Sequence, residues 1–249
     1  MTRLARTYIV ASTPRSGSSL LCEALEKTGI AGRPAEVFAP DFRGPWFDRW
    51  HLSPGAPFSE YLAAARRHGT GRNGVFGVKL QYMHVSALAN WALESCDTVL
   101  DRLFPGAAFI NLVRQDRRAQ ALSWFRAIRT NKWFKTDPVR ADPAPELDPR
   151  AVLDLEAHLA WQQSAWEQHF AKRGIRPLTI QYESLASDHR AATARVLAFL
   201  GLDPHAADSS PEPVLVSQAD EVTAQWRRIM DGATRASGTA LDRDALLGR

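Results

Sequence analysis

The sequence predicts a three-layer α/β/α fold, in which helices cover both faces of a central parallel sheet. Three observations lead to this prediction: short apolar runs, helical patterns between them, and Gly, Pro or polar residues at their ends. Because strands that alternate with helices form parallel sheets with helical crossovers, the order of these patterns decides the fold class. The sequence shows no internal repeat or low-complexity tract, so residues 1–249 are expected to form one domain.

Four runs rich in β-branched or aromatic residues are expected to be buried strands. They are Tyr8–Ala11, Val75–Leu80, Ala107–Val113 and Leu178–Tyr182. The first lies between Thr7 and Ser12, and the others directly follow Gly74, Gly106 and Pro177. Turn-forming residues at these positions separate strands from the segments before them.

Four longer segments are expected to be helices. They are Ser19–Thr28, Asp116–Thr130, Pro149–Lys172 and Asp188–Leu200. In the second, Ala119 and Leu122 lie at helical spacing, and Asp148 is a natural N-cap for the third. A glycine lies just beyond the end of the first, third and fourth segments, at Gly29, Gly174 and Gly201, as is common at helix C-termini. The stretches Arg33–Pro57 and Asp137–Pro149, dense in Pro and charge, are expected to be irregular walls of a ligand site.

Composition excludes several classes of protein. The 31 Lys and Arg residues outnumber the 27 Asp and Glu residues by four, which gives a net charge of only +4. We therefore expect no nucleic-acid partner. Two cysteines, Cys22 and Cys96, cannot form a disulfide framework or a four-thiolate zinc site. No run approaches the roughly 18 apolar residues of a transmembrane segment. The apolar run near the N-terminus is too short for a secretory signal, so a cytoplasmic location is expected.

The most informative stretch is the loop between the first strand and the first helix. It contains Arg15, Ser16, Gly17, Ser18 and Ser19. A strand, a tight turn and a helix start direct several backbone N–H groups and the positive end of the helix dipole to one point. The serine hydroxyls add donors and Arg15 adds a forked cation. An ordinary N-cap is the alternative, but so many donors exceed what capping requires. The loop is therefore predicted to bind phosphate or sulfate.

This loop differs from that of a nucleotide kinase. A P-loop carries Gly-Lys-Ser/Thr, whose hydroxyl holds magnesium, whereas here the Lys is missing and no glycine precedes Arg15 in the loop. A nucleotide-dependent kinase or phosphotransferase, and a non-catalytic nucleotide-binding module, are therefore the disfavoured alternatives. No metal site is expected.

The loop resembles the 5′-phosphosulfate loop of sulfotransferases, where a Pro-Arg/Lys-Ser-Gly-Ser/Thr turn holds the donor PAPS (3′-phosphoadenosine 5′-phosphosulfate). Arg114, at the end of the third strand, and Ser123, nine residues later, match an Arg and a Ser that grip the donor's 3′-phosphate in that superfamily. Structural alternatives are a salt bridge between Arg114 and Asp116 and a buried helix hydroxyl at Ser123.

Over most of its length the chain resembles the bacterial trehalose 2-sulfotransferase family. The matching stretches are Ser16–Ser18, Thr28–Gly32, Pro34–Glu36, Asn73–Leu80, Gln120–Ala127 and Gln225–Arg228. The resemblance implies a P-loop-like, nucleotide-binding sulfotransferase fold and a homodimer. It also implies metal-independent, in-line transfer of the sulfonyl group of PAPS to a hydroxyl of a small carbohydrate or glycoconjugate, such as a sugar or glycolipid. Arg33 stands where the family has an acidic residue.

The expected catalytic residues are Glu36, Arg15 and Lys79. Glu36 matches the carboxylate that the resembling family uses as general base, while His51 and His84 are the alternatives. Arg15 would stabilise charge on the leaving group. Lys79, at the end of the second strand, either points into the same crevice or is a solvated strand-end residue.

Several aromatic and basic residues complete the expected site. Trp46 and Trp50 lie in the irregular segment and would offer ring faces to the acceptor. Near the C-terminus, Trp226 and Arg227 either close over the donor's 3′-phosphate or belong to an exposed basic helix face.

Overall fold

A four-stranded, all-parallel sheet forms the centre of the fold, with the strand order β2-β1-β3-β4. The structure is a computed structural model that describes residues 7–133, 146–213 and 221–236. The strands are β1 (Thr7–Ser12), β2 (Phe76–Gln81), β3 (Ala108–Val113) and β4 (Leu178–Gln181). All four predicted strands are confirmed, with ends that shift by one residue at most.

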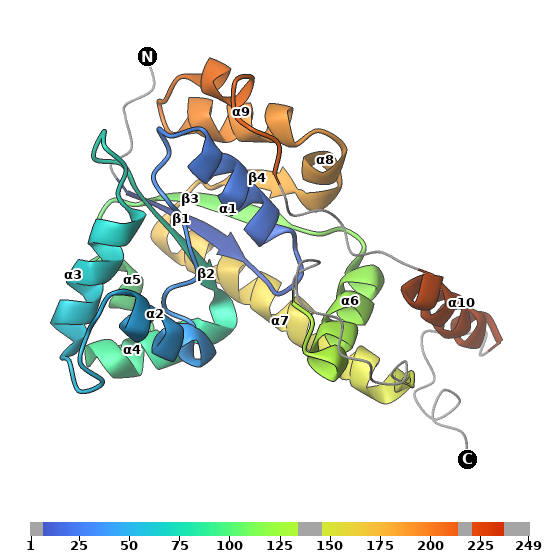
Figure 1. Ribbon diagram of the computed structural model, residues 1–249. Coiled ribbons are helices and arrows are strands. Elements are labelled where there is room, and N and C mark those ends of the chain that lie inside the picture. Colours follow the sequence, from blue (N-terminus) through green and yellow to red (C-terminus); the bar gives the residue numbers. More distant parts are fainter. Residues whose placement is uncertain (1–6, 134–145, 214–220, 237–249) are drawn as a thin grey trace.

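The central strand β1 contributes side chains to both cores because successive residues point to opposite faces of a sheet. Tyr8 and Val10 pack in one apolar cluster with residues of α1 (Ser18–Lys27) and α9 (His189–Phe199). Ile9 and Ala11 belong to a second cluster on the other face. Figure 1 shows the resulting three layers, with α1, α8 and α9 above the sheet and α7 below it. The predicted α/β/α architecture is confirmed.

The second cluster is built by the helices that cover the lower face. They are α3 (Phe58–Gly69), α4 (Val85–Ala92), α5 (Val99–Leu103) and α7 (Pro149–Arg173). Trp166 of α7 is fully buried there and stacks on Phe170 at a ring-centroid distance of 5.7 Å. Because α7 spans 25 residues, it also passes α6 (Arg117–Thr130).

A third apolar cluster joins α6 and α7 to α10 (Glu221–Ala236). The remaining elements are the helix α8 (Tyr182–Ser187) and three 3-10 turns, η1 (Pro40–Phe42), η2 (Tyr82–His84) and η3 (Pro204–Ala207). Within the described ranges no helix is both long and apolar enough to cross a bilayer.

The four predicted helices are confirmed as α1, α6, α7 and α9, with ends shifted by one residue. The Asp148 carboxylate caps α7 by accepting the Ala151 N–H at 3.0 Å, as predicted. The prediction that Arg33–Pro57 is irregular throughout was wrong, because η1 and α2 (Arg43–Arg49) lie within it. Aromatic packing against α3 stabilises this short helix despite its Gly and Pro. Most of Asp137–Pro149 lies outside the described residues.

Candidate active site

The site lies where the carboxyl ends of the parallel strands meet, which is the usual ligand position in an open α/β sheet. The loop Thr13–Gly17 leaves the end of β1 and leads directly into α1. The first bond of α1 runs from the Leu21 N–H to the Gly17 carbonyl at 3.1 Å. The N–H groups of Ser18 and Ser19 therefore have no acceptor inside the helix and are available to an anion.

The loop adopts a tight turn that only certain residues tolerate. Arg15 has φ of 58° and Gly17 has φ of 85°, both in the left-handed region. A Cβ atom at Gly17 would lie 2.5 Å from the ring of Tyr182, so glycine is required by space as well as by φ. The fully buried Ser16 hydroxyl donates to the Thr13 carbonyl at 2.8 Å and so holds the turn closed.

Two long-range hydrogen-bond donors fix the loop to the rest of the molecule. The buried Gln120 amide on α6 donates to the Thr13 hydroxyl at 2.8 Å and to the Pro14 carbonyl at 2.6 Å. The Trp166 indole on α7 donates to the Ser12 carbonyl at 3.0 Å. A loop held from two helices keeps its N–H groups in position before any ligand arrives, which lowers the cost of binding.

The structure brings three of the predicted donor-binding residues together. The Arg15 guanidinium donates from Nε to the Ser123 hydroxyl at 3.0 Å and from Nη1 to the Trp133 carbonyl at 2.6 Å. Arg114 donates from Nη1 to the Arg15 carbonyl at 3.1 Å. Its guanidinium lies 4.3 Å from the centre of the Tyr182 ring, a cation–π distance.

The suggested salt bridge between Arg114 and Asp116 is not among the ion pairs of the described residues. The Asp116 carboxylate instead caps α6 and pairs with Arg227, which also contacts Asp231 at 3.1 Å. The Nε of Arg114 is buried and has no hydrogen-bond partner in the described structure. Burial lowers the pKa of Arg114 below its ordinary value, but a guanidinium remains cationic at neutral pH. A buried cation with a spare donor is suited to an anionic ligand.

Lys79 connects the anion-binding loop with Glu36. Its Nζ lies 2.6 Å from Oε2 of Glu36 and donates to the Ser19 hydroxyl at 3.2 Å. Lys79 is only 7% exposed, so it is not a solvated strand-end residue. Burial alone would lower the pKa of Lys79, but the Glu36 carboxylate and the Cys22 thiol raise it, so the ammonium stays charged.

Backbone pairing explains why Lys79 and Glu36 meet. The extended segment around Ala35 runs beside β2, and the Lys79 N–H donates to the Ala35 carbonyl at 3.1 Å. Val37 and Phe38, which follow Glu36, are buried in the lower core and anchor the segment. The Glu36 side chain is therefore held by its neighbours at the edge of the sheet.

His84 is the second neighbour of Glu36. Its Nδ1 lies 3.5 Å from Oε1 of Glu36, and neither atom has a hydrogen bond within the described residues. The side chain is only 12% exposed, and it follows β2 through η2. Burial lowers the pKa of His84 despite the nearby carboxylates, so the imidazole is neutral at pH 7. The other candidate histidine, His51, is exposed and lines a separate pocket.

Comparison with known proteins identifies the family to which this site belongs. The family model described as Stf0 sulphotransferase matches residues 7–230. The chain belongs to the Stf0 sulphotransferase family. It is 33% identical over 262 aligned positions to a trehalose 2-sulfotransferase of Mycobacterium tuberculosis, covering 91% of this chain and 94% of that protein. A trehalose 2-sulfotransferase of Mycolicibacterium smegmatis is 29% identical, with 88% and 92% covered.

Solved structures of two sulfotransferases are more distant from this Stf0 sulphotransferase. The sulfotransferase domain of an olefin synthase from Synechococcus PCC 7002 is 16% identical, with a TM-score of 0.42 over 96% of this chain and 97% of that one. A sulfotransferase from Alicyclobacillus acidocaldarius is 14% identical, with a TM-score of 0.47 over 98% and 99%.

The predicted acceptor tryptophans of this Stf0 sulphotransferase lie in an aromatic cluster against α3. The rings of Trp46 and Trp50 are 5.0 Å apart, and Trp50 packs edge-on against Tyr61 at the same distance. Among the described residues, no ring contact joins these tryptophans to Glu36 or to the loop. Their assignment to the acceptor stays a prediction.

Trp226 and Arg227, which were predicted to close over the donor, have different surroundings in the structure. Trp226 is 5% exposed and packs edge-on against Phe125, so its ring belongs to the third apolar cluster. Arg227 is directed to Asp116 at the start of α6. Its assignment to the 3′-phosphate also stays a prediction.

Three residues of the site were not assigned a role from the sequence. Gln120 fixes the loop, Tyr182 packs on Gly17 and Arg114, and Oε1 of Glu183 accepts the backbone N–H of Gln115 at 3.1 Å. Gln120 lies in a stretch that resembles the trehalose 2-sulfotransferase family, and Tyr182-Glu183-Ser184-Leu185 matches a Tyr-Glu-x-Leu element of sulfotransferases that is interpreted from the sequence as structural. Their contacts are too distant along the chain for a local pattern to predict.

Proposed function

We propose that this sulfotransferase transfers the sulfonyl group of PAPS to a hydroxyl of a small carbohydrate or glycoconjugate. The observation that carries the proposal is the position of Lys79, whose ammonium contacts both a loop hydroxyl and the Glu36 carboxylate. The buried Lys79 ammonium thereby connects the anion-binding loop with the candidate base. This arrangement suits a reaction in which a sulfonyl group passes from a loop-bound phosphate to a hydroxyl beside a carboxylate.

The donor half of the proposal rests on the anion-binding loop. The N–H groups of Ser18 and Ser19, the loop glycine and Arg15 would hold the 5′-phosphosulfate. Arg114, with its unpaired buried Nε, and Ser123 would hold the 3′-phosphate. The arginine pair neutralises much of the donor's charge without a metal, so the reaction would be metal-independent.

In the acceptor half, Glu36 would take the hydroxyl proton as the hydroxyl oxygen forms its bond to sulfur. The bond between sulfur and the bridging phosphate oxygen breaks, and 3′-phosphoadenosine 5′-phosphate leaves with the electron pair. Oε1 of Glu36 is buried and lacks a hydrogen bond in the described residues, so an entering hydroxyl would supply one. Lys79 would stabilise negative charge on the sulfonyl oxygens as it forms.

The names of two relatives support a carbohydrate acceptor, since both are called trehalose 2-sulfotransferase. At about 30% identity they favour a related sugar and leave the acceptor's identity to experiment. The homodimer implied by the resemblance also stays a prediction, which light scattering would test.

The test is transfer of labelled sulfonyl group from PAPS to a panel of sugars, with and without EDTA. Transfer to a carbohydrate that is unaffected by EDTA would support the proposal. Loss of transfer with EDTA would indicate a metal-dependent phosphotransferase-like mechanism. Binding of PAPS without any turnover on the panel would indicate a nucleotide-binding module and overturn the proposal.

A further inference from the structure

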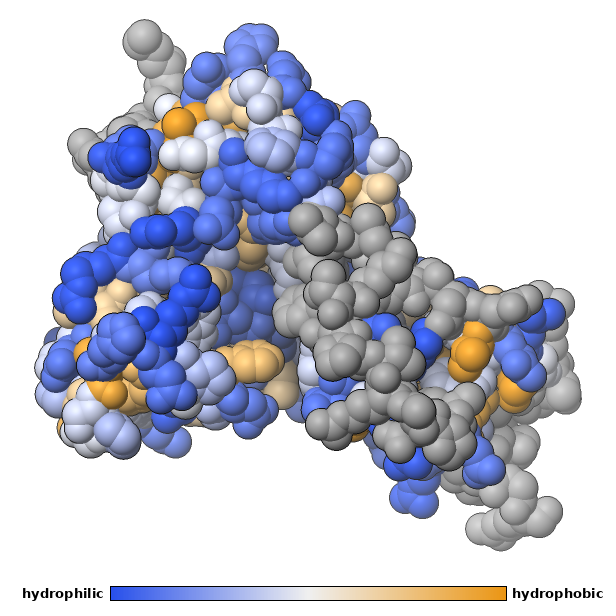
Figure 2. All heavy atoms as spheres, viewed as in Figure 1, coloured by the Kyte–Doolittle hydropathy of each residue, from blue (hydrophilic) through white to orange (hydrophobic). Residues whose placement is uncertain are grey.

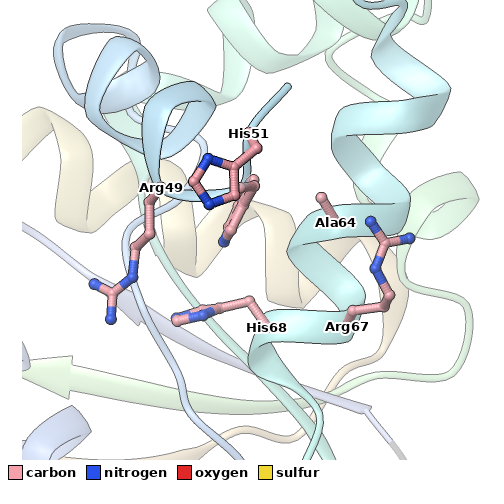
Figure 3. A pocket seen from close by; sticks show the side chains of 6 residues that line it. Arg49, His51, Ala64, Arg67 and His68 are labelled. Atoms are coloured by element: carbon pink, nitrogen blue, oxygen red, sulfur yellow. The ribbon is translucent and has the colours of Figure 1, made fainter. Parts of the chain in front are cut away.

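A second pocket lies between α2 and α3, away from the anion-binding loop. Its volume is about 310 Å³, and its lining residues are Arg49, Trp50, His51, Ala64, Arg67 and His68. Figure 3 shows Arg49 and Arg67 on opposite sides of this pocket, with His51 and His68 between them. The surface over this part of the molecule is mostly hydrophilic (Figure 2). Apart from His51, which the sequence analysis gives as an alternative base, none of the lining residues was assigned to the donor or to the base.

The pocket carries positive charge from the two arginine side chains that line it. Arg49 and Arg67 are exposed and form no ion pair in the part of the chain that the structure describes. A third cation, Arg33, donates from Nε to the His68 carbonyl at 2.8 Å. Burial, together with Arg33 and Arg49, lowers the pKa of His68 to about 4. Such a concentration of one sign of charge in a concave surface attracts an anion.

Aromatic rings form one wall of the same pocket. Trp50 lines it, and Trp46 packs on both Trp50 and His68, with the His68 ring 4.8 Å away. The indole N–H of Trp50 is buried and has no acceptor among the described residues. Flat ring faces suit the C–H surface of a sugar, and guanidinium groups suit phosphate, sulfate or carboxylate. The pocket therefore combines the two parts needed to bind a charged sugar.

The pocket is connected to the proposed catalytic carboxylate by one short segment. Arg33 reaches the edge of the pocket through its hydrogen bond to the His68 carbonyl. Arg33 and Glu36 lie in the same extended stretch beside β2. Three residues of extended chain span at most about 10 Å. Arg33 and Glu36 are therefore close enough for one disaccharide-sized acceptor to extend from the edge of the pocket to the carboxylate.

We propose that the acceptor is an anionic carbohydrate, whose charged substituent binds between Arg49 and Arg67 while one of its hydroxyls reaches Glu36. This inference rests on the proposed function and narrows its substrate class. The presence of Arg33, where the resembling family has an acidic residue, is consistent with a change from a neutral to a negatively charged acceptor.

The experiment compares trehalose with trehalose 6-phosphate, a neutral and an anionic sugar of the same skeleton. The wild-type protein is expected to favour the phosphorylated sugar in kcat/KM by about tenfold or more, as for a charge-assisted contact. Because the arginines are exposed, high salt should reduce this preference. Arg67→Gln and Arg49→Gln should each bring the ratio of the two kcat/KM values towards one.

The matched control is Arg195→Gln, because Arg195 is an exposed arginine on α9, on the other side of the sheet. It should keep the wild-type ratio. Calorimetry of the phosphorylated sugar without donor provides a readout that does not depend on turnover. Equal use of the two sugars, or an unchanged ratio in Arg67→Gln, would overturn this inference and leave the proposed function standing. Arginine-dependent binding of the phosphorylated sugar without transfer to any sugar of the panel would support the pocket and overturn the proposed function.

Discussion

At the scale of single residues, the proposed chemistry depends on a largely buried cluster of Glu36, Lys79 and His84. One carboxylate oxygen of Glu36 is bound by Lys79 at 2.6 Å, and the other faces the neutral His84 at 3.5 Å. The two oxygens therefore have different surroundings. Lys79 holds the carboxylate in place through one oxygen, and in the proposed reaction the second oxygen would accept the substrate proton.

Replacing the proposed base removes the proton acceptor and preserves the shape of the side chain. Glu36→Gln is expected to lower turnover by about 10²–10⁴-fold, the range for a positioned general base. Binding of 3′-phosphoadenosine 5′-phosphate, measured by calorimetry, should survive. The matched control is Glu167→Gln on the exposed side of α7, which should not change turnover. Near-normal turnover of Glu36→Gln, with loss of turnover in His84→Ala, would assign the proton transfer to the histidine.

The buried guanidinium of Arg114 predicts how the protein distinguishes two donors. Wild type should strongly prefer PAPS to adenosine 5′-phosphosulfate, which lacks the 3′-phosphate. Arg114→Ala should reduce this preference by about 10–100-fold, the value of a charge-assisted contact. The measurement is the ratio of kcat/KM for the two donors. Equal ratios in both proteins would show that Arg114 has another role.

At the scale of elements, the site is formed by residues at the carboxyl ends of the four strands. The loop after β1 supplies N–H groups, β2 carries Lys79 near its end and leads through η2 to His84, and Arg114 comes directly after β3. The start of α8 after β4 supplies Tyr182, which packs under both Arg114 and Gly17. Each strand of the sheet therefore contributes one part of the site.

The turn at Gly17 can be tested with a matched pair of glycines. Gly17→Ala adds a Cβ that would lie 2.5 Å from Tyr182, whereas Gly29→Ala, at φ of 72°, meets no atom within 4 Å. Both should lose about 1–2 kcal/mol of stability from the left-handed backbone, as measured by urea unfolding. Only Gly17→Ala should also weaken donor binding by about tenfold or more. Equal donor affinity in the two variants would mean that the loop tolerates the added atom.

Local patterns predicted the four strands and four of the helices, because strands and helix ends depend on neighbouring residues. The four strands follow from short apolar runs bounded by turn-forming residues, and the Asp148 cap of α7 follows from capping preferences. The helix α2 was missed because Gly44 and Pro45 interrupt its pattern, while its stability comes from rings packed on Tyr61. The sequence alone offers no measure of such tertiary packing.

The candidate site was predictable where its residues are consecutive and less so where they are brought together by folding. The loop with Arg15 follows from one strand–turn–helix pattern. The approach of His84 to Glu36 depends on how the Ala35 segment pairs with β2, which no local pattern contains. Gln120 was missed for the same reason, since it contacts a loop more than a hundred positions earlier in the chain.

At the scale of the whole molecule, buried histidines make stability depend on pH. Burial and Arg173 lower the pKa of His169 to about 4, and His68 has a similarly lowered pKa. In the unfolded chain a histidine titrates near 6.5. The unfolded state therefore takes up protons first as the pH falls, and the folded state loses stability from about pH 6.5 towards 4.

This acid sensitivity is measurable by urea unfolding at several pH values between 5 and 7.5, above the range where most carboxylates titrate. Each histidine is expected to contribute at most about 1.4 kcal/mol per pH unit, reduced by solvent screening. His169→Gln should reduce the dependence of the free energy of unfolding on pH. His205→Gln, an exposed control, should leave this dependence unchanged. If the free energy of unfolding depended on pH equally in His169→Gln and in the wild type, the contribution assigned to His169 would be contradicted.

The strand order also has a consequence for how the chain folds during its synthesis. β1 is made first but lies inside the sheet, where the register pairs Tyr8 with Gly77 on one side and Ala108 on the other. At about 5–20 residues per second, the ribosome takes several seconds to deliver both partners. Until then the apolar segment Tyr8–Ala11 lacks at least one of its two neighbouring strands, and long-range parallel pairing is slow even once it can begin. The nascent chain should therefore depend on chaperones that bind exposed apolar segments near its N-terminus, and it should reach its folded form only after the third strand has left the exit tunnel.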